Sequence, residues 1–278
     1  MRPIVILLLC LSTALLWSAP AALEIVRPVI ATSDGGPPEP ASYEYVPGET
    51  LYFTCRIAGF TKTAEEKVHV AYSVEAFDSK GVPLTEIYKN DLMTDVTPQD
   101  KEWMPKIVTE VQLPPLIASG TYKLVIKAED LQAKTNATLD VPFLVRGRSV
   151  EPSDTLVIRN FEFFRSEDAT EPIEKAAYKA GDSVWARFDI TGFQYGAKNH
   201  IDVGYITMVY SPSGKLLWTQ PEPAADTSEA FYPKRYVQAS VGINLLKDTK
   251  PGVFSIGVKL TDKVGNQTFE QKYKFMVE

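Results

Sequence analysis

The feature that most constrains this chain is an internal repeat. The stretch that begins at Leu23 reappears from Leu156 at a constant offset of 133 residues, as 181 minus 48 shows. The first half of each copy aligns without a gap, and its shared positions are Gly48, Gly59, Phe60, Val70, Tyr72 and Gly81, which return as Gly181, Gly192, Phe193, Val203, Tyr205 and Gly214. A turn and burial pattern that is written twice indicates two tandem domains of one fold.

Both copies alternate apolar and polar residues with a period of two, which is typical of a strand with one buried face. The predicted inward positions are Leu51, Phe53, Cys55 and Ile57 in the first copy, and Val184, Ala186, Phe188 and Ile190 in the second. Further strands follow in the same phase, and the 20 Pro interrupt the chain too often for long helices. We therefore predict an all-β protein with about seven strands per copy.

Two short motifs resemble those of known sandwich families. The segment from Ser119 to Leu124 resembles the corner before the sixth strand of immunoglobulin-like domains, although Leu124 stands where those domains have a Cys. The turn Asp262-Lys263-Val264-Gly265-Asn266 is similar to one found in bacterial immunoglobulin-like and macroglobulin-type repeats. The resemblance implies two immunoglobulin-like β-sandwiches. It also implies a tyrosine corner at Tyr122, which the second copy cannot form because it has Phe254 there.

The N-terminus has the pattern of a secretory signal peptide. Arg2 precedes an apolar run from Ile4 to Trp17, and the small residues Ala19 and Ala21 offer a cleavage site. We predict a signal peptide over residues 1–21, a first sandwich over 22–147 and a second over 148–278. The mature protein is then secreted or periplasmic, with no stable membrane insertion after cleavage.

Composition and motifs argue against several kinds of chemistry. A net charge of −6 without a basic patch argues against nucleic acid as a partner. Cys55 has the phase of a core residue, and His69 and His200 are neither clustered nor equivalent in the repeat, so we predict no metal and no cofactor. Because neither a nucleophile elbow nor a phosphate-binding glycine loop is present, we predict that the protein is not an enzyme.

Four aromatic residues are the candidate ligand-binding side chains. Tyr52 and Trp185 occupy equivalent outward positions in the two copies, where a ring could stack on a sugar or anchor a protein. The alternative is that loops or the other domain cover these two rings, which then have only a structural role. Trp103 and Trp218, in the loop-rich middle stretch of each copy, are of the same kind.

The leading functional prediction is a non-enzymatic interaction or structural protein of the cell envelope, with a protein or glycan partner. A carbohydrate-binding accessory protein that uses the four aromatics is one alternative, and a periplasmic chaperone that offers a sheet edge is another. The link between the copies, Arg146-Gly147-Arg148-Ser149, is short. We therefore expect limited bending and a groove between the two domains.

Overall fold

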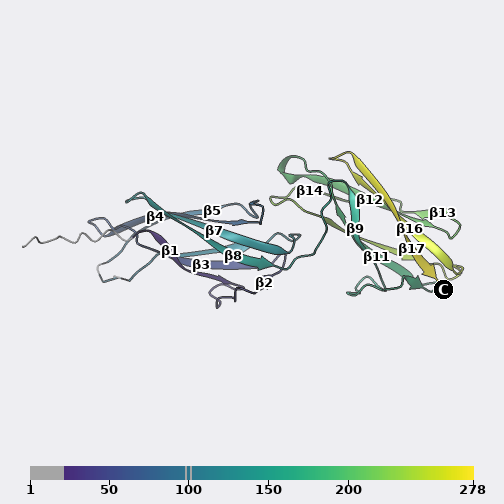
Figure 1. Cartoon of the computed structure of the whole chain (residues 1–278), viewed down its shortest axis with the longest axis horizontal. Coiled ribbons are helices and arrows are strands. Elements are labelled where there is room, and N and C mark those ends of the chain that lie inside the picture. The colour runs from purple at the N-terminus through teal and green to yellow at the C-terminus, as the bar shows by residue number, and fades with distance from the viewer. Residues whose placement is uncertain (1–21, 98, 101) are drawn as a thin grey trace, which may run out of the picture.

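A computed structural model describes residues 22–278 except 98 and 101, so the signal-peptide prediction lies outside the described residues. The chain forms two β-sandwiches that lie end to end, with the C-terminus at the end far from the first sandwich (Figure 1). The described residues contain no helix that could span a lipid bilayer.

The first sandwich packs a three-stranded sheet on a five-stranded one. The smaller sheet has the order β1-β3-β6, and the larger has the order β2-β8-β7-β4-β5. The strands are β1 (Glu24–Ala31), β2 (Glu44–Tyr45), β3 (Thr50–Ala58), β4 (Lys67–Phe77), β5 (Tyr88–Asp95), β6 (Lys106–Gln112), β7 (Gly120–Asp130) and β8 (Thr135–Val145). The chain changes sheets at every connection except the β4–β5 and β7–β8 hairpins, a division of strands that is similar to that of immunoglobulin-like sandwiches.

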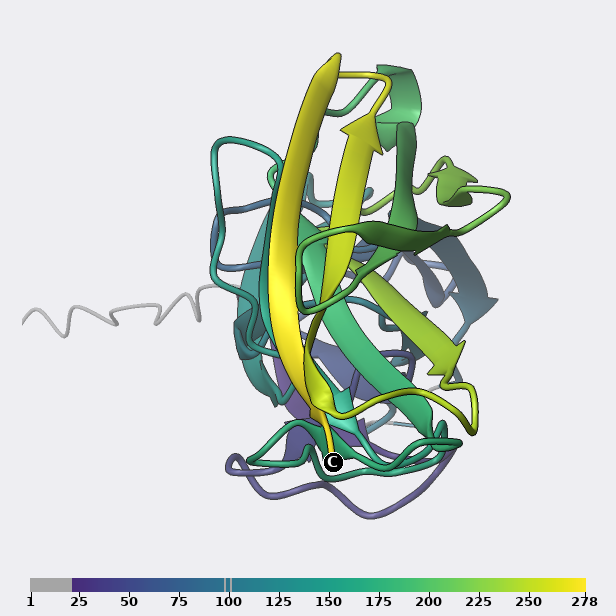
Figure 2. The same ribbon diagram turned by 90° about the vertical axis from the view of Figure 1, so that its right-hand side faces the viewer.

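The second sandwich repeats the arrangement. One sheet has the order β15-β11-β9, and the other has the order β10-β17-β16-β12-β13, with β14 also paired to β12. The elements are β9 (Val157–Phe164), β10 (Ala177–Tyr178), β11 (Ser183–Thr191), the 3₁₀ turn η1 (Ala197–Asn199), β12 (Ile201–Tyr210), β13 (Leu216–Thr219), β14 (Ala224–Ser228), β15 (Val237–Asn244), β16 (Gly252–Asp262) and β17 (Gln267–Val277). Seen from the C-terminal end, β16 and β17 lie in front of the first sandwich (Figure 2).

The predicted inward faces are confirmed. Residues Leu51, Phe53, Cys55 and Ile57 on β3 are all buried, as are Val184, Ala186, Phe188 and Ile190 on β11. Each sandwich has its own cluster of buried apolar residues. Burial raises the pKa of the Cys55 thiol to about 12, so this cysteine is a core residue that stays protonated.

The repeat extends to details of the backbone. In each copy the first strand has a bulge, and the residue at that bulge, Arg27 or Asn160, has a positive φ. Gly192 shows why a glycine is needed at its position, because a Cβ atom there would lie 1.8 Å from the Thr155 carbonyl oxygen. The expected tyrosine corner is also present, with the Tyr122 hydroxyl donating to the Ala118 carbonyl oxygen at 2.8 Å.

A buried aspartate ends the equivalent strands β7 and β16. Asp130 accepts hydrogen bonds from the backbone N–H groups of Thr61, Gln132 and Ala133. Asp262 accepts them from the N–H groups of Gln194 and Gly265. Each carboxylate thus connects the loop after β3 or β11 to the last hairpin of the same sandwich. Burial alone would raise the pKa of Asp130, but the three N–H donors outweigh it and hold the pKa below its ordinary value.

We expect Asp130→Ala to lower the free energy of unfolding by about 3 kcal/mol, because three backbone N–H donors lose a buried, charged acceptor. Urea unfolding followed by tryptophan fluorescence measures the change. The matched control is Asp140→Ala, which removes only an exposed ion pair with Lys123 and should cost less than about 1 kcal/mol. Equal losses in the two variants would contradict a special role for Asp130.

Candidate functional site

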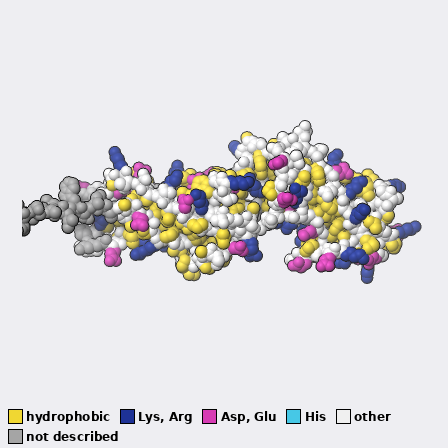
Figure 3. Space-filling model, in the orientation of Figure 1, with side chains coloured by type: hydrophobic (Ala, Val, Ile, Leu, Met, Phe, Trp, Pro, Cys, Tyr) yellow, Lys and Arg dark blue, Asp and Glu magenta, His cyan; other side chains and the backbone are white. Residues whose placement is uncertain are grey.

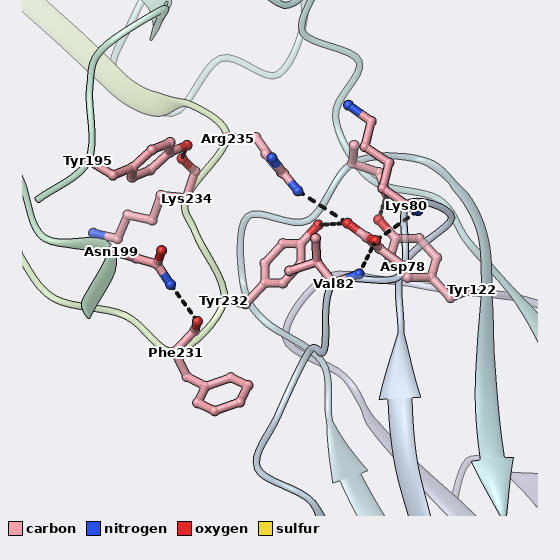
Figure 4. A network of polar contacts seen from close by, with 11 residues as sticks. Asp78, Lys80, Val82, Tyr122, Tyr195, Asn199, Phe231, Tyr232, Lys234 and Arg235 are labelled. Carbon is pink, nitrogen blue, oxygen red and sulfur yellow. Dashed lines mark hydrogen bonds and ion pairs between the residues drawn. The ribbon is translucent and has the colours of Figure 1, made fainter. Parts of the chain in front are cut away.

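The two sandwiches are joined by a loop of the second that enters the first. We call residues 229–236, between β14 and β15, the Tyr232 loop. Tyr232 is 7% exposed, and its ring packs in the hydrophobic core cluster of the first sandwich rather than in that of its own. The neighbouring Phe231 is 51% exposed and points away from this contact (Figure 4). One aromatic side chain therefore anchors the second sandwich on the end of the first.

The Asp78 carboxylate lies at the centre of this contact (Figure 4). Its Oδ1 accepts hydrogen bonds from the N–H groups of Lys80 and Val82, which close the turn after β4. Its Oδ2 accepts from the Tyr232 hydroxyl at 3.0 Å and from the Arg235 guanidinium at 3.1 Å. Burial would raise the pKa of Asp78, yet the Val82 N–H, the Tyr232 hydroxyl, the Lys80 N–H and the Arg235 charge together lower it. The carboxylate is thus held in its charged form.

The Tyr232 loop is held in place by its own sandwich. The Asn199 amide donates to the carbonyl oxygens of Ala230 and Phe231, at 3.1 and 2.7 Å. Near the other end of the loop, the Tyr195 hydroxyl donates to the Lys234 carbonyl oxygen at 2.5 Å, and the Lys234 ammonium pairs with Asp226. A loop with this many fixed points presents Tyr232 and Arg235 with little further loss of conformational entropy.

The link between the copies is attached to both sandwiches. On the first, Ser119 donates to the Gly147 carbonyl oxygen at 2.6 Å, and a Cβ atom on Gly147 would lie 2.2 Å from the Ile117 carbonyl oxygen. On the second, the Arg148 guanidinium lies 2.7 Å from the buried carboxylate of Asp189. Two consecutive residues are therefore fixed to different sandwiches.

A groove of about 310 Å³ lies between the sandwiches, as the short link led us to expect. Its walls come from both sides of the contact. The first sandwich contributes the turn that holds Asp78 and the start of β7 with Thr121 and Tyr122, and the second contributes Phe193, Tyr195, Tyr232 and Arg235. The groove combines aromatic walls with a few polar groups, as small binding sites often do.

The four aromatics singled out in the sequence lie in different parts of the two sandwiches. Tyr52 lies on β3 and Trp185 on β11, and both are half-buried. Trp185 has a structural partner, because its ring lies over Gly242 of the neighbouring strand β15, where a Cβ atom would come within 2.7 Å of the ring. The structure brings neither residue into the groove between the sandwiches.

The other two tryptophans differ in exposure. Trp103 is partly buried against the first core, where it makes an edge contact with Phe60 at a centroid distance of 5.7 Å. Trp218 lies on the short edge strand β13 and is 41% exposed. Neither lines the groove between the sandwiches, so the candidate aromatics do not form one surface with it.

The two histidines form no metal site in the described part of the chain. His69 Nε2 lies 2.7 Å from Asp91 Oδ1, and no group of three or more His, Cys, Asp or Glu is placed to hold an ion among the described residues.

The residues at the contact were not predicted from the sequence. Tyr232 and Arg235 lie in the middle stretch, where the copies differ in length by one residue. If residues are counted back from the aligned strands β6 and β15, Arg235 takes the place of Trp103. One sequence signal could have pointed to this contact. Tyr232 and Arg235 have no similar residue at the equivalent positions of the first copy, and a proline lies between them.

Comparisons with known proteins give no family. No family model matches the chain, and no curated protein matches it. Two similar solved structures are the C-terminal domains of the AgI/II polypeptide BspA of Streptococcus agalactiae and of the antigen I/II-family protein AspA of Streptococcus pyogenes. They are 10% and 11% identical, with TM-scores of 0.30 and 0.31. Each match covers 91% of this chain, and it covers 100% and 99% of those chains.

A family 123 glycoside hydrolase from Clostridium perfringens is also similar, with 12% identity and a TM-score of 0.31. The match covers 45% of this chain and 27% of the hydrolase. Likenesses at these scores say nothing about what this chain binds.

We expect Tyr232→Ala to uncouple the sandwiches, because it removes a buried ring and a hydrogen bond to Asp78, at a cost of about 3 kcal/mol. Small-angle scattering should then show a broader distribution of interdomain distances. Phe231→Ala is the control, since it changes an exposed neighbour in the same loop. An unchanged distribution for Tyr232→Ala would contradict the anchor.

The contact should also weaken in acid. Of the groups that lower the pKa of Asp78, Tyr232 and Arg235 belong to the other sandwich, so the part of the shift that they supply is linked to docking: this contribution is complete above the free value of about 4 and is lost as the pH falls through the lowered pKa. Scattering at decreasing pH should therefore show the wild type loosening below about pH 4. Asp78→Asn should lack this step, and a transition of the same size in that variant would assign it to other groups.

Proposed function

We propose that this protein is a non-enzymatic binding protein of the cell envelope, exported from the cytoplasm, which presents a pre-formed groove between two coupled sandwiches to a protein or glycan partner. The observation that carries the proposal is the burial of Tyr232 in the core of the other sandwich, with its hydroxyl on Asp78. A groove whose two walls are held in this way loses little entropy when a partner enters.

The charged side chains at the groove hydrogen-bond one another, which supports binding rather than catalysis. Asp78, Arg235 and Tyr232 are three of the ionisable side chains that line the groove, and each hydrogen-bonds or packs against another of the three. The carboxylate is kept charged as an acceptor and the guanidinium is kept charged as a donor. Their environment therefore suits a fixed scaffold around the groove.

Both signs of charge occur on both sandwiches on the face seen in Figure 3. A partner of mixed polarity suits such a surface better than a highly charged polymer does. Export is supported by the N-terminal sequence pattern described above.

The test is a binding experiment with the mature chain, residues 22–278, against its own envelope and secreted fractions. Thr121→Trp places a bulky ring at an exposed position in the groove wall, and we expect it to abolish capture of the partner. Val253→Trp is the matched control, because Val253 is exposed, takes the place of Thr121 in the second copy and lies at the far end of the molecule. A partner that both variants retain equally would rule out the groove.

A further inference from the structure

A hollow of the first sandwich lies on the outer face of its five-stranded sheet. It has a volume of about 820 Å³, and four strands line it with one residue triplet each: residues 89–91 of β5, 71–73 of β4, 127–129 of β7 and 136–138 of β8. In each triplet the outer two residues belong to the phase that faces away from the core, since Val70, Val74, Ile126 and Asp130 of the opposite phase are buried. We call this hollow the outer trough.

Strand pairing arranges the outward residues of the trough in two rows across the sheet. One row is Asp91, Ala71, Glu129 and Asn136, and the other is Lys89, Ser73, Lys127 and Thr138. Residues two apart on a strand are separated by about 6.7 Å, and neighbouring strands by about 4.8 Å. A row with three hydrogen-bond acceptor side chains therefore runs beside a row with two ammonium groups.

The hollow exists because the residues over β4 are small. Ala71 and Ser73 form its floor, and longer charged side chains stand on β5 and β7 at either side. Within the described residues, Lys89, Lys127 and Glu129 form no ion pair, although all three are exposed. Their charges are thus available to a ligand.

The second sandwich lacks this arrangement, so the fold does not require it. In the same register, Ile206 takes the place of Ser73 and lies opposite Lys259 on the neighbouring strand. Thr261 takes the place of Glu129. Glu270 stands opposite Lys259, where the first copy has Thr138 opposite Lys127. The trough is a property of the first copy alone.

We propose that the outer trough is a binding site for an acidic oligosaccharide. An anionic group of the sugar lies over Ser73 between the ammonium groups of Lys89 and Lys127. Sugar hydroxyl or amide N–H groups donate to Asp91, Glu129 and the Asn136 amide oxygen. The two rows supply the charge and the acceptors that such a ligand needs.

Two features disfavour other ligands. The backbone groups of β4 are paired with β5 on one side and with β7 on the other, so a peptide cannot bind over them as an added strand. The carboxylates of Asp91 and Glu129 repel the closely spaced phosphates of a nucleic acid. A ligand with fewer charges and many hydroxyl groups avoids both problems.

The test is titration calorimetry with the mature chain at low salt, using two acidic probes that carry one carboxylate for every two sugars: a tetrasaccharide of glucuronate and N-acetylglucosamine, and the unsulfated chondroitin tetrasaccharide. Neutral cellotetraose and tetraglutamate are the comparison ligands. We expect at least one acidic probe to bind about tenfold or more tightly than either comparison ligand. Binding of no acidic probe, or equal binding of tetraglutamate, would overturn the proposal.

Two trough variants, each with a matched control in the second sandwich, locate the site. Ser73→Ile fills the floor as Ile206 does in the second copy, and Lys89→Ala with Lys127→Ala removes the anion site; each should weaken binding about tenfold or more. The matched controls, Ile206→Ser and Lys259→Ala, change the equivalent face of the second sandwich and should leave affinity unchanged. Thermal melts confirm that Ser73→Ile is folded, and the double lysine variant provides a second test on exposed residues only. Wild-type affinity in both trough variants would place the ligand elsewhere.

Discussion

The Asp78 carboxylate accepts hydrogen bonds from both sandwiches, and their relative placement depends on it. Its Oδ1 closes a turn of its own sandwich, while its Oδ2 receives Tyr232 and Arg235 from the other. A charge withdrawn from water in this way is stable only while its donors stay in place. The Tyr232 loop and the link at Gly147 and Arg148 also depend on each other. Both connect the two sandwiches, so the position of each limits where the other can lie.

The strands of both sandwiches could be predicted from the sequence because burial follows a period of two. The inward row on β3 and the equivalent row on β11 are each set by local alternation, and the repeat states the pattern twice. The tyrosine corner at Tyr122 was likewise readable, since its donor and acceptor lie only four residues apart. Such features depend on near neighbours along the chain.

The contact and the trough depend instead on distant residues. Tyr232 and Asp78 are 154 residues apart, and nothing in the local pattern around either one indicates the other. The phase of Tyr52 and Trp185 was predicted to be outward, but phase does not say what lies beside a ring, and Trp185 is partly covered because Gly242 leaves room for it. The trough rows likewise depend on strand register, which places Lys89 and Lys127 on either side of Ser73 although they are far apart in sequence.

The link has a mechanical consequence. The first and last described strands begin and end at opposite ends of the molecule (Figure 1), so a pull on the two ends passes through the junction between the sandwiches. Gly147 and Arg148 are consecutive and are fixed to different sandwiches, and one residue extends by only about 3.4 Å. While the Gly147 and Arg148 contacts hold, the junction therefore has little slack, and tension loads these contacts together with the Tyr232 anchor. The two sandwiches would transmit force as one stiff unit rather than as two domains joined by a flexible linker.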